Sequence, residues 1–181
     1  MNELLDRYIN LLYTYRQTVN ITGVKSREDI AAIVADAVTG FPSEADVLDL
    51  GSGAGIPGIP LKLLNPGISI SFCDKARKKM NIVSSMCFQL DIPIQGMFIG
   101  DVFSFIDDLK ERFSFVVSRG MGDTAFVAGA ALPLLKHGGT LMLWKPKDFD
   151  ITAEGVPTGY DFIEKRMQTL CSIAVFRKTG V

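Results

Sequence analysis

Apolar and polar residues repeat with two different periods along this chain, and the period changes near residue 45. In residues 3–16 the apolar side chains recur at helical spacing. A second helix is expected from Ser26 to about Gly40, with Asp29 as its capping-box-like partner. From residue 45 onward, short apolar runs alternate with helical segments. We therefore expect a single domain (1–181) that consists of a small N-terminal helical cap (1–40) and an α/β core (45–181).

The core contains five apolar runs that are predicted to be strands, at 45–50, 68–74, 94–100, 113–118 and 140–144. Helices are expected between them, ending near Leu64 and covering about 76–90, 101–109 and 123–136. Strands joined by helical segments imply parallel crossovers and a doubly wound sheet. The runs 160–170 and 172–178 have almost nothing between them, which predicts an antiparallel hairpin. Residues 145–159 are expected to be a polar loop long enough to line a site.

The composition limits the class of protein. The 181 residues are 48% hydrophobic and 22% charged, which is typical of a soluble globular protein. The longest apolar runs fall short of the roughly 20 residues that a membrane span needs, and the acidic, amphipathic start does not resemble a signal peptide. We therefore expect a cytoplasmic protein. Three scattered cysteines and one histidine favour reduced thiols and no metal site. The net charge of −1 means that any nucleic-acid partner would need a local basic patch.

The segment DLGSGAGIPGIP (49–60) directly follows the first predicted strand. Gly51, Gly53 and Gly55 can adopt positive φ and allow a ligand to approach the main chain. Pro57 suits the first turn of the following helix. A tight turn without a ligand is the alternative interpretation, but three spaced glycines directly after a strand favour a ligand site.

The acidic residues at the strand ends indicate which ligand this is. The G-S-G-A-G spacing departs from a dinucleotide fingerprint, and Asp49 would be poorly placed beside a pyrophosphate. Asp49 can instead receive a cationic amino group, directly or through water, as in the methionine half of S-adenosylmethionine (SAM). Asp74 could accept both ribose hydroxyls, and Asp101 lies where such folds often hold the adenine amino group. Each aspartate alone is more often a helix N-cap, but three at successive strand ends favour SAM.

With its C-terminal hairpin, the chain is expected to adopt the Rossmann-like fold of SAM-dependent methyltransferases. That fold has a mostly parallel seven-stranded sheet with one reversed strand. The chain also resembles a specific family over most of its length. The segments YRQTVNIT (15–22), DLGSGAGIPGIPL (49–61), DKARKK (74–79), FSFVVSRG (113–120) and LWK (143–145) are similar to motifs of the bacterial GidB-type methyltransferases. The resemblance implies transfer of a methyl group to guanine N7 of 16S ribosomal RNA in the small ribosomal subunit.

The resemblance also implies roles for individual residues. It implies that Gly51 and Ile56 contact SAM and that Val102 and Phe103 flank the adenine. It further implies that Asn20 and Thr22 could order the cap over the cofactor, although they could also simply hold a turn.

Arg119 and Lys145 are the candidate positioning residues for the reaction. The resemblance implies that Arg119 reaches the methionine end or the methyl-transfer site. Arg119 also directly follows a buried strand, where a guanidinium can pair with a carboxylate, a phosphate or a base edge. A surface arginine bonded to a loop carbonyl is the alternative. Lys145 has a similar, weaker case after the fifth strand. Because guanine N7 carries a free lone pair, no general base is expected.

The chain departs from the family where the acceptor would bind. The family carries R-H-x-x-D-S in its second helix, whereas this chain has AIVADA (32–37), which keeps Asp36 alone. Two alternatives therefore stay open: a paralogue that binds SAM or S-adenosylhomocysteine without methylating ribosomal RNA, and a methyltransferase for another acceptor. A basic stretch after the second strand is a candidate RNA contact or a solvated surface, and it consists of Lys75, Arg77, Lys78 and Lys79.

Overall fold

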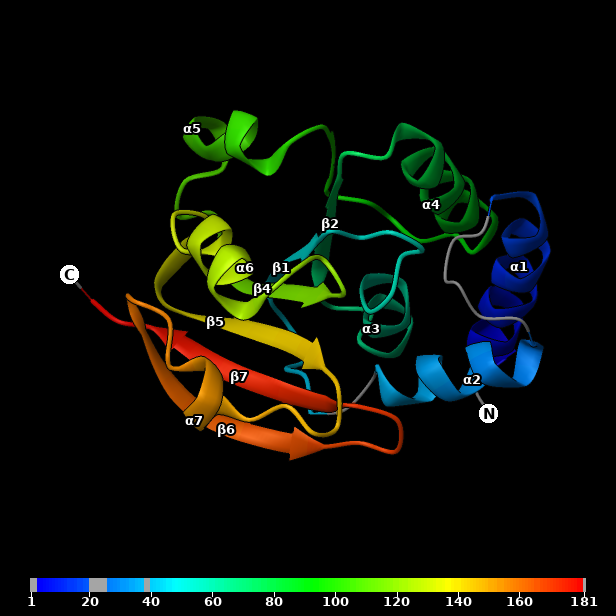
Figure 1. Ribbon diagram of the computed structural model, residues 1–181. Helices are drawn as coiled ribbons and strands as arrows, with labels where there is room; N and C mark the ends of the chain where they lie inside the picture. The colour runs from blue at the N-terminus through cyan, green and yellow to red at the C-terminus, as the bar shows by residue number, and fades with distance from the viewer. Residues whose placement is uncertain (1–2, 20–25, 38–39, 181) are drawn as a thin grey trace.

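Seven strands form a single sheet in the computed structural model, which describes residues 3–19, 26–37 and 40–180 (Figure 1). Their order is β3-β2-β1-β4-β5-β7-β6. The strands are β1 (Asp46–Leu50), β2 (Ser69–Asp74), β3 (Gly96–Ile99), β4 (Phe113–Arg119), β5 (Leu135–Lys145), β6 (Tyr160–Met167) and β7 (Ser172–Lys178). Every pairing from β3 to β5 is parallel, and β7 runs antiparallel to both β5 and β6. The predicted mostly parallel sheet with a C-terminal hairpin is confirmed.

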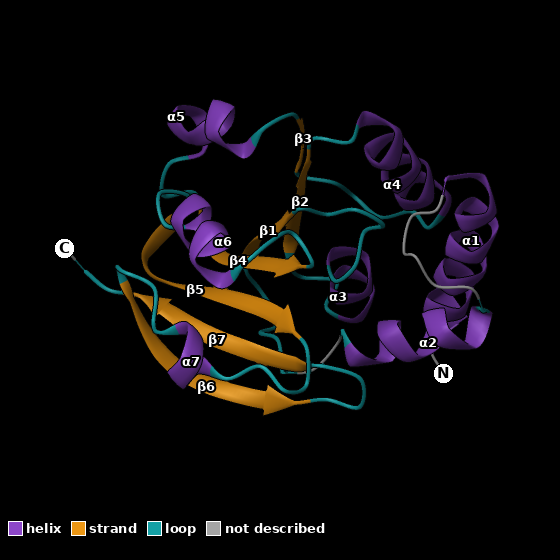
Figure 2. Ribbon diagram, viewed as in Figure 1, coloured by secondary structure: helices purple, strands orange, loops and turns teal. Residues whose placement is uncertain are grey.

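Helices cover both faces of the sheet (Figure 2). They are α1 (Glu3–Val19), α2 (Arg27–Asp36), α3 (Gly58–Leu64), α4 (Arg77–Gln89), the 3₁₀ helix η1 (Val102–Phe105), α5 (Ile106–Leu109), α6 (Thr124–Ala131) and α7 (Ile151–Glu154). In one buried core, the helices α1, α2, α3 and α4 pack against the sheet, and this core includes Tyr8, Ile30 and Met80. A second core lies on the opposite face beneath α6 and includes Val127 and Leu134. This two-sided burial explains why the central strands are continuous apolar runs.

The N-terminal helices pack against the core beside α3 and α4. Ser26 caps α2 through a full capping box, because its side chain accepts from the Asp29 amide while the Asp29 carboxylate accepts from the Ser26 amide. Helix α2 ends at Asp36, earlier than the expected Gly40, and residues 38–39 lie outside the described part of the chain.

The largest departure from the predicted elements lies between α6 and β5. We expected a helix to about residue 136, but α6 ends at Ala131 and β5 already begins at Leu135. Pro133 lacks the amide hydrogen that would continue the helix, and Leu135 pairs with Phe113 of β4.

The 145–159 segment contains the short helix α7, and Lys165 Nζ donates to the carbonyls of Lys147 and Phe149.

Candidate functional site

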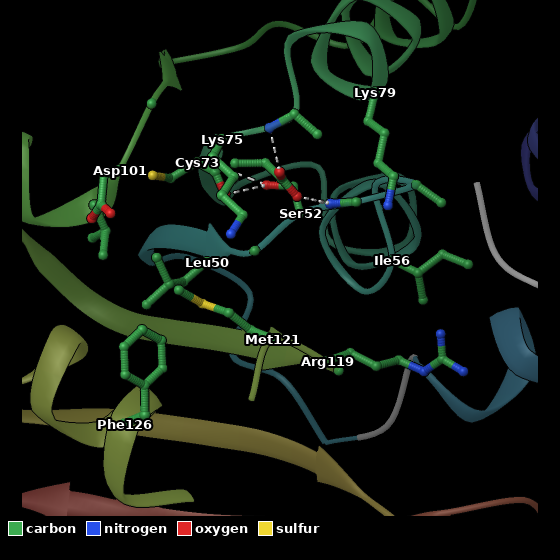
Figure 3. Close-up of a pocket in the computed structure, with 18 residues that line it drawn as sticks. Leu50, Ser52, Ile56, Cys73, Lys75, Lys79, Asp101, Arg119, Met121 and Phe126 are labelled. Atoms are coloured by element: carbon green, nitrogen blue, oxygen red, sulfur yellow. Dashed lines mark hydrogen bonds between the residues drawn. The ribbon is translucent and has the colours of Figure 1, made fainter. Parts of the chain in front are cut away.

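A cavity of about 450 Å³ opens at the carboxyl ends of β1, β2, β3 and β4 (Figure 3). The strand order reverses between β1 and β4, and this is where open α/β sheets bind their ligands. The predicted site residues that line the cavity are Gly51, Gly53, Ile56, Asp74, Lys75, Lys79, Asp101, Val102 and Arg119. The predicted residues outside the lining are Asp49, Gly55, Arg77, Lys78, Phe103 and Lys145. The size falls within the range of about 300–1,000 Å³ for small-molecule sites.

The glycine-rich loop after β1 forms one wall of the cavity, and main-chain bonds hold it to β2. The amides of Gly51 and Ser52 donate to the Cys73 carbonyl at 2.8 and 3.1 Å. The Ser52 hydroxyl donates to the Asp49 carbonyl and accepts from the Cys73 amide. Gly51 has a φ of +71°, and a Cβ there would lie 2.8 Å from the Met121 side chain. A side chain at position 51 would therefore strain the loop and displace Met121.

Asp74, at the end of β2, faces the cavity and also holds the loop. Its Oδ2 accepts from the Gly53 amide, and its Oδ1 accepts from the Ala76 amide, both at 2.8 Å. Each carboxylate oxygen has a second lone pair. Asp74 can therefore accept hydroxyl groups from a ligand without releasing the loop.

Asp101 and its neighbours form the wall beyond β3. Asp101 Oδ1 accepts from the Phe103 amide at 3.0 Å, which caps η1. Val102 lines the cavity. The exposed Phe103 ring lies outside the lining and meets Phe126 edge to face, with a centroid separation of 6.1 Å. Phe126, from α6, lines the cavity.

Asp49 is fully buried behind the glycine-rich loop. Its Oδ2 accepts from the Gly58 amide at 2.9 Å, and its Oδ1 has no hydrogen-bond partner among the described residues. Burial raises the pKa of Asp49 to about 7; the Gly58 amide opposes this shift and the charge of Asp74 adds to it. A Cβ at position 58 would lie 2.5 Å from Asp49 Oδ2, so only glycine leaves room for this carboxyl. Direct contact between Asp49 and a ligand remains a prediction.

Arg119 and Lys145 point to opposite faces of the sheet. Arg119 is the register partner of Trp144, and side chains alternate along a strand, so Lys145 faces the other way. Arg119 lines the cavity, and its guanidinium extends away from Met121 (Figure 3). Lys145 Nζ lies 3.7 Å from Glu154 Oε2 and 5.2 Å from the centroid of the Phe149 ring. Lys145 lines a second, small hollow, and that hollow shares Gly120 and Met121 with the cavity.

The basic stretch divides in two at the start of α4. Lys75 and Lys79 line the cavity, while Arg77 and Lys78 are exposed outside it. All four lie at or before the first turn of α4, whose N-terminus carries a positive partial charge. An anionic partner at this surface would be attracted by both the side chains and the helix.

Asp36 has a structural role in the cap. Its buried carboxylate accepts from the amides of Thr169 and Leu170 in the β6–β7 turn. Its carbonyl accepts from Trp144 Nε1 at 3.2 Å. Asp36 therefore ties the end of α2 to the C-terminal hairpin. Ile33 packs against the core, and Asn20 and Thr22 lie outside the described residues.

The sequence profile of the family described as GidB, rRNA small subunit methyltransferase G, matches residues 1–172. The chain belongs to this family. Curated relatives named ribosomal RNA small subunit methyltransferase G include one from Streptococcus pneumoniae serotype 19F, 27% identical over 152 residues, which covers 79% of this chain and 64% of the relative. Another, from Oenococcus oeni, is 28% identical over 151 residues and covers 78% and 62%. The GidB-family chain thus spans less than two thirds of the length of these relatives.

Solved structures of methyltransferases share the fold of this GidB-family chain. A predicted O-methyltransferase from Agrobacterium tumefaciens has a TM-score of 0.63 at 16% identity, covering 83% of this chain and 80% of that chain. A putative methylase from Haemophilus influenzae has a TM-score of 0.57 at 16% identity, covering 76% and 89%. The predicted Rossmann-like methyltransferase fold is therefore confirmed.

Several residues that line the cavity were not predicted from the GidB motifs. Cys73, Met121 and Phe126 are the main examples. Burial raises the pKa of the Cys73 thiol to about 12, and the charges of Asp74, Asp101 and Asp49 add to the shift, so the thiol stays protonated. Its strand position next to Asp74 could have indicated Cys73, but Met121 and Phe126 reach the cavity through loop and helix packing.

The described ranges (3–19, 26–37 and 40–180) offer neither a metal-binding cluster nor a membrane-spanning helix. None of their histidine, cysteine, aspartate and glutamate side chains form a group of three or more that could hold a metal ion. Within the same ranges, no helix has both the length and the apolar character to cross a membrane.

Proposed function

We propose that this chain transfers the methyl group of SAM to guanine N7 in small-subunit ribosomal RNA. The observation that carries the proposal is the cavity at the β1/β4 switch point in a member of the rRNA small subunit methyltransferase G family. Its walls combine a glycine-rich loop, carboxylates at the ends of two strands and a cavity-facing arginine.

The residues of the cavity fit SAM. Gly51 and Gly53 leave the main chain open to a ligand, and Asp74 has spare lone pairs for the ribose hydroxyls. Asp101 and Val102 would hold the adenine, with Phe126 beside them. Buried behind the loop, Asp49 would attract the methionine ammonium group through water or after a small movement of the loop. SAM supplies an activated methyl group on a sulfonium.

The protein contributes binding and orientation to this reaction. Guanine N7 has a free lone pair, so no residue has to remove a proton. Arg119 would orient the acceptor through its O6 or a phosphate, and Lys145 would act from the neighbouring hollow. The rate would then depend on in-line geometry and on the exclusion of water.

Ribosomal RNA, or the small ribosomal subunit, is the proposed partner. Lys75, Arg77, Lys78 and Lys79 form a basic rim next to the cavity that would neutralise phosphates. We further propose that the cap and the core (1–40 and 45–181) act as one domain, and that the protein works in the cytoplasm.

A second candidate function rests on the second helix. Where the family has Arg-His, this chain has Ala32 and Ile33, and Ile33 packs into the core. A protein that binds SAM or S-adenosylhomocysteine without methylating RNA would show such a change, as would a methyltransferase for another acceptor.

Two measurements test the proposal in order. Calorimetry with SAM and with S-adenosylhomocysteine tests the cofactor site, and absence of binding of both at millimolar concentration would reject every candidate. Methyl transfer from labelled SAM to small subunits that lack the mark then tests the acceptor. Label in the RNA at low salt, declining steeply as salt is added, supports the proposal. SAM binding without RNA label supports the second candidate.

A further inference from the structure

Tyr8 links the N-terminal helix to the glycine-rich loop. Its hydroxyl donates to the Ala54 carbonyl at 3.0 Å, across 46 residues of chain. Tyr8 is fully buried, and Ala54 is nearly so. Burial raises the pKa of the Tyr8 hydroxyl well above its usual value; Asp49 and Cys87 add to the shift and Arg119 opposes it. The hydroxyl therefore remains a donor at neutral pH.

The opposite side of the same loop forms the cavity wall. Ala54 and Ile56 line the cavity, and Gly53 and Gly55 on either side of Ala54 have φ values of +53° and +80°. Glycines have no side chains that could hold the loop, so their conformation depends on the hydrogen bonds that the main-chain groups of the loop make. The Gly55 amide donates to the Ser52 carbonyl at 2.7 Å. The Tyr8 hydroxyl donates to the carbonyl of Ala54, which precedes Gly55 in this turn.

Other hydrogen bonds of α1 lead away from the cavity. The Tyr15 hydroxyl pairs with Ser85 Oγ at 2.9 Å and accepts from Gln89 Nε2 at 2.8 Å, near the far end of α4. Arg7 also donates to the Gln89 carbonyl. These bonds fix the helix without touching the loop, which makes Tyr15 a matched control for Tyr8.

We infer that Tyr8 is a positioning residue that orients the Ala54 peptide and thereby shapes the cofactor wall. Arg27 of α2 donates to Asn10 and Asp6 of α1, so the cap and the loop belong to one hydrogen-bonded unit. The inference rests on the proposed SAM site. Its physical basis is that a buried carbonyl without a donor relaxes toward water, which lowers the preorganisation of the wall.

The test compares Tyr8→Phe with two controls on the same helix, Tyr15→Phe and Ile9→Val. Tyr15→Phe loses a hydroxyl whose partners lie in α4, and Ile9→Val loses a buried methyl group without removing a hydrogen bond. We expect the Kd for SAM to rise about tenfold in Tyr8→Phe and less than about twofold in the controls. The melting temperature should fall by a few degrees in all three variants.

Amide hydrogen exchange of the ligand-free protein gives a second readout. Exchange at Gly55 should become faster in Tyr8→Phe and stay unchanged in both controls. An unchanged Gly55 rate, or Kd values that follow the melting temperatures equally in all three variants, would overturn the inference. If the wild type does not bind SAM, the proposed function fails, and the exchange experiment still decides whether Tyr8 positions the loop.

Discussion

The two sides of the site present different parts of the chain: main-chain groups on one side and long side chains on the other. On the β1–β2 side, main-chain amides of the glycine-rich loop bond to the Cys73 carbonyl and to Asp74. On the β4–β5 side, Arg119 lines the cavity and Lys145 lines the adjoining small hollow, and these two long side chains point to opposite faces of the sheet. A wall made of main-chain amides is specified by a short sequence motif. The position of a long side chain depends instead on the residues that pack around it. The cofactor side is therefore the better defined of the two.

The largest expected effect concerns Asp49, which is buried behind the glycine-rich loop on the β1–β2 side. The pKa of Asp49 is raised to about 7 in the folded protein, so between about pH 4 and 7 the folded state holds a proton that the unfolded state has lost. Stability should therefore fall as the pH rises through this window and level off above it. The full change is roughly 4 kcal/mol at about 1.36 kcal/mol per pKa unit.

Asp49→Asn should remove this dependence, because the amide does not titrate. Urea unfolding of the wild type and the variant at several pH values measures the difference. Parallel stability curves for the two proteins would show that Asp49 is ionised at neutral pH.

Arg119 tests the acceptor side. Arg119→Ala should lower methyl transfer at least about 100-fold, the usual cost of losing a group that orients or stabilises the reacting centre. The Kd for SAM should change by less than about threefold, and the melting temperature should stay the same. Arg112→Ala is the control, since Arg112 is exposed just before β4, at the opposite end of that strand. Equal rates for the two variants would remove Arg119 from the site.

Asp74 and Asp101 are compared by how much each contributes to the affinity for SAM. Asp74→Asn should raise the Kd for SAM about tenfold, because its amide nitrogen would face the amide hydrogen of Gly53 or Ala76. Asp101→Asn should raise it only about threefold, because Asp101 is exposed and its cap involves Oδ1 alone. Calorimetry measures both values, and the reverse order would place the main polar contact beyond β3.

Of the two candidate positioning residues, Lys145 should have the smaller effect on methyl transfer. Lys145→Met keeps the aliphatic stem and removes the charge, so we expect transfer to fall about fivefold with the Kd for SAM unchanged. The exposed Lys147 supplies the control, Lys147→Met, which should behave as the wild type. Single-turnover transfer separates this effect from RNA binding. A change in SAM affinity instead would mean that the small hollow belongs to the cofactor side.

The glycine-rich loop and the acidic strand ends could be predicted from the sequence because each lies within one short segment. The strand followed by glycines, with Asp74 and Asp101 at the next strand ends, is encoded within short segments. Parallel strands bring their carboxyl ends to one edge, so the pattern alone places Gly51, Gly53, Asp74 and Asp101 around one cavity. The same reasoning failed for the boundary of α6, where strand pairing of Leu135 overrode the helical pattern.

The sequence by itself determined the sheet, its reversed strand and the loop that lines the cavity, because hydrophobic period and glycine spacing act over a few residues. Only the tertiary structure decided that Asp49 is buried behind the loop, that Phe126 lines the cavity while Phe103 lies outside the lining, and that Asp36 ties α2 to a turn more than 130 residues away. These outcomes depend on contacts between distant segments. No local pattern carries that information, because burial and hydrogen-bond partners are fixed by packing.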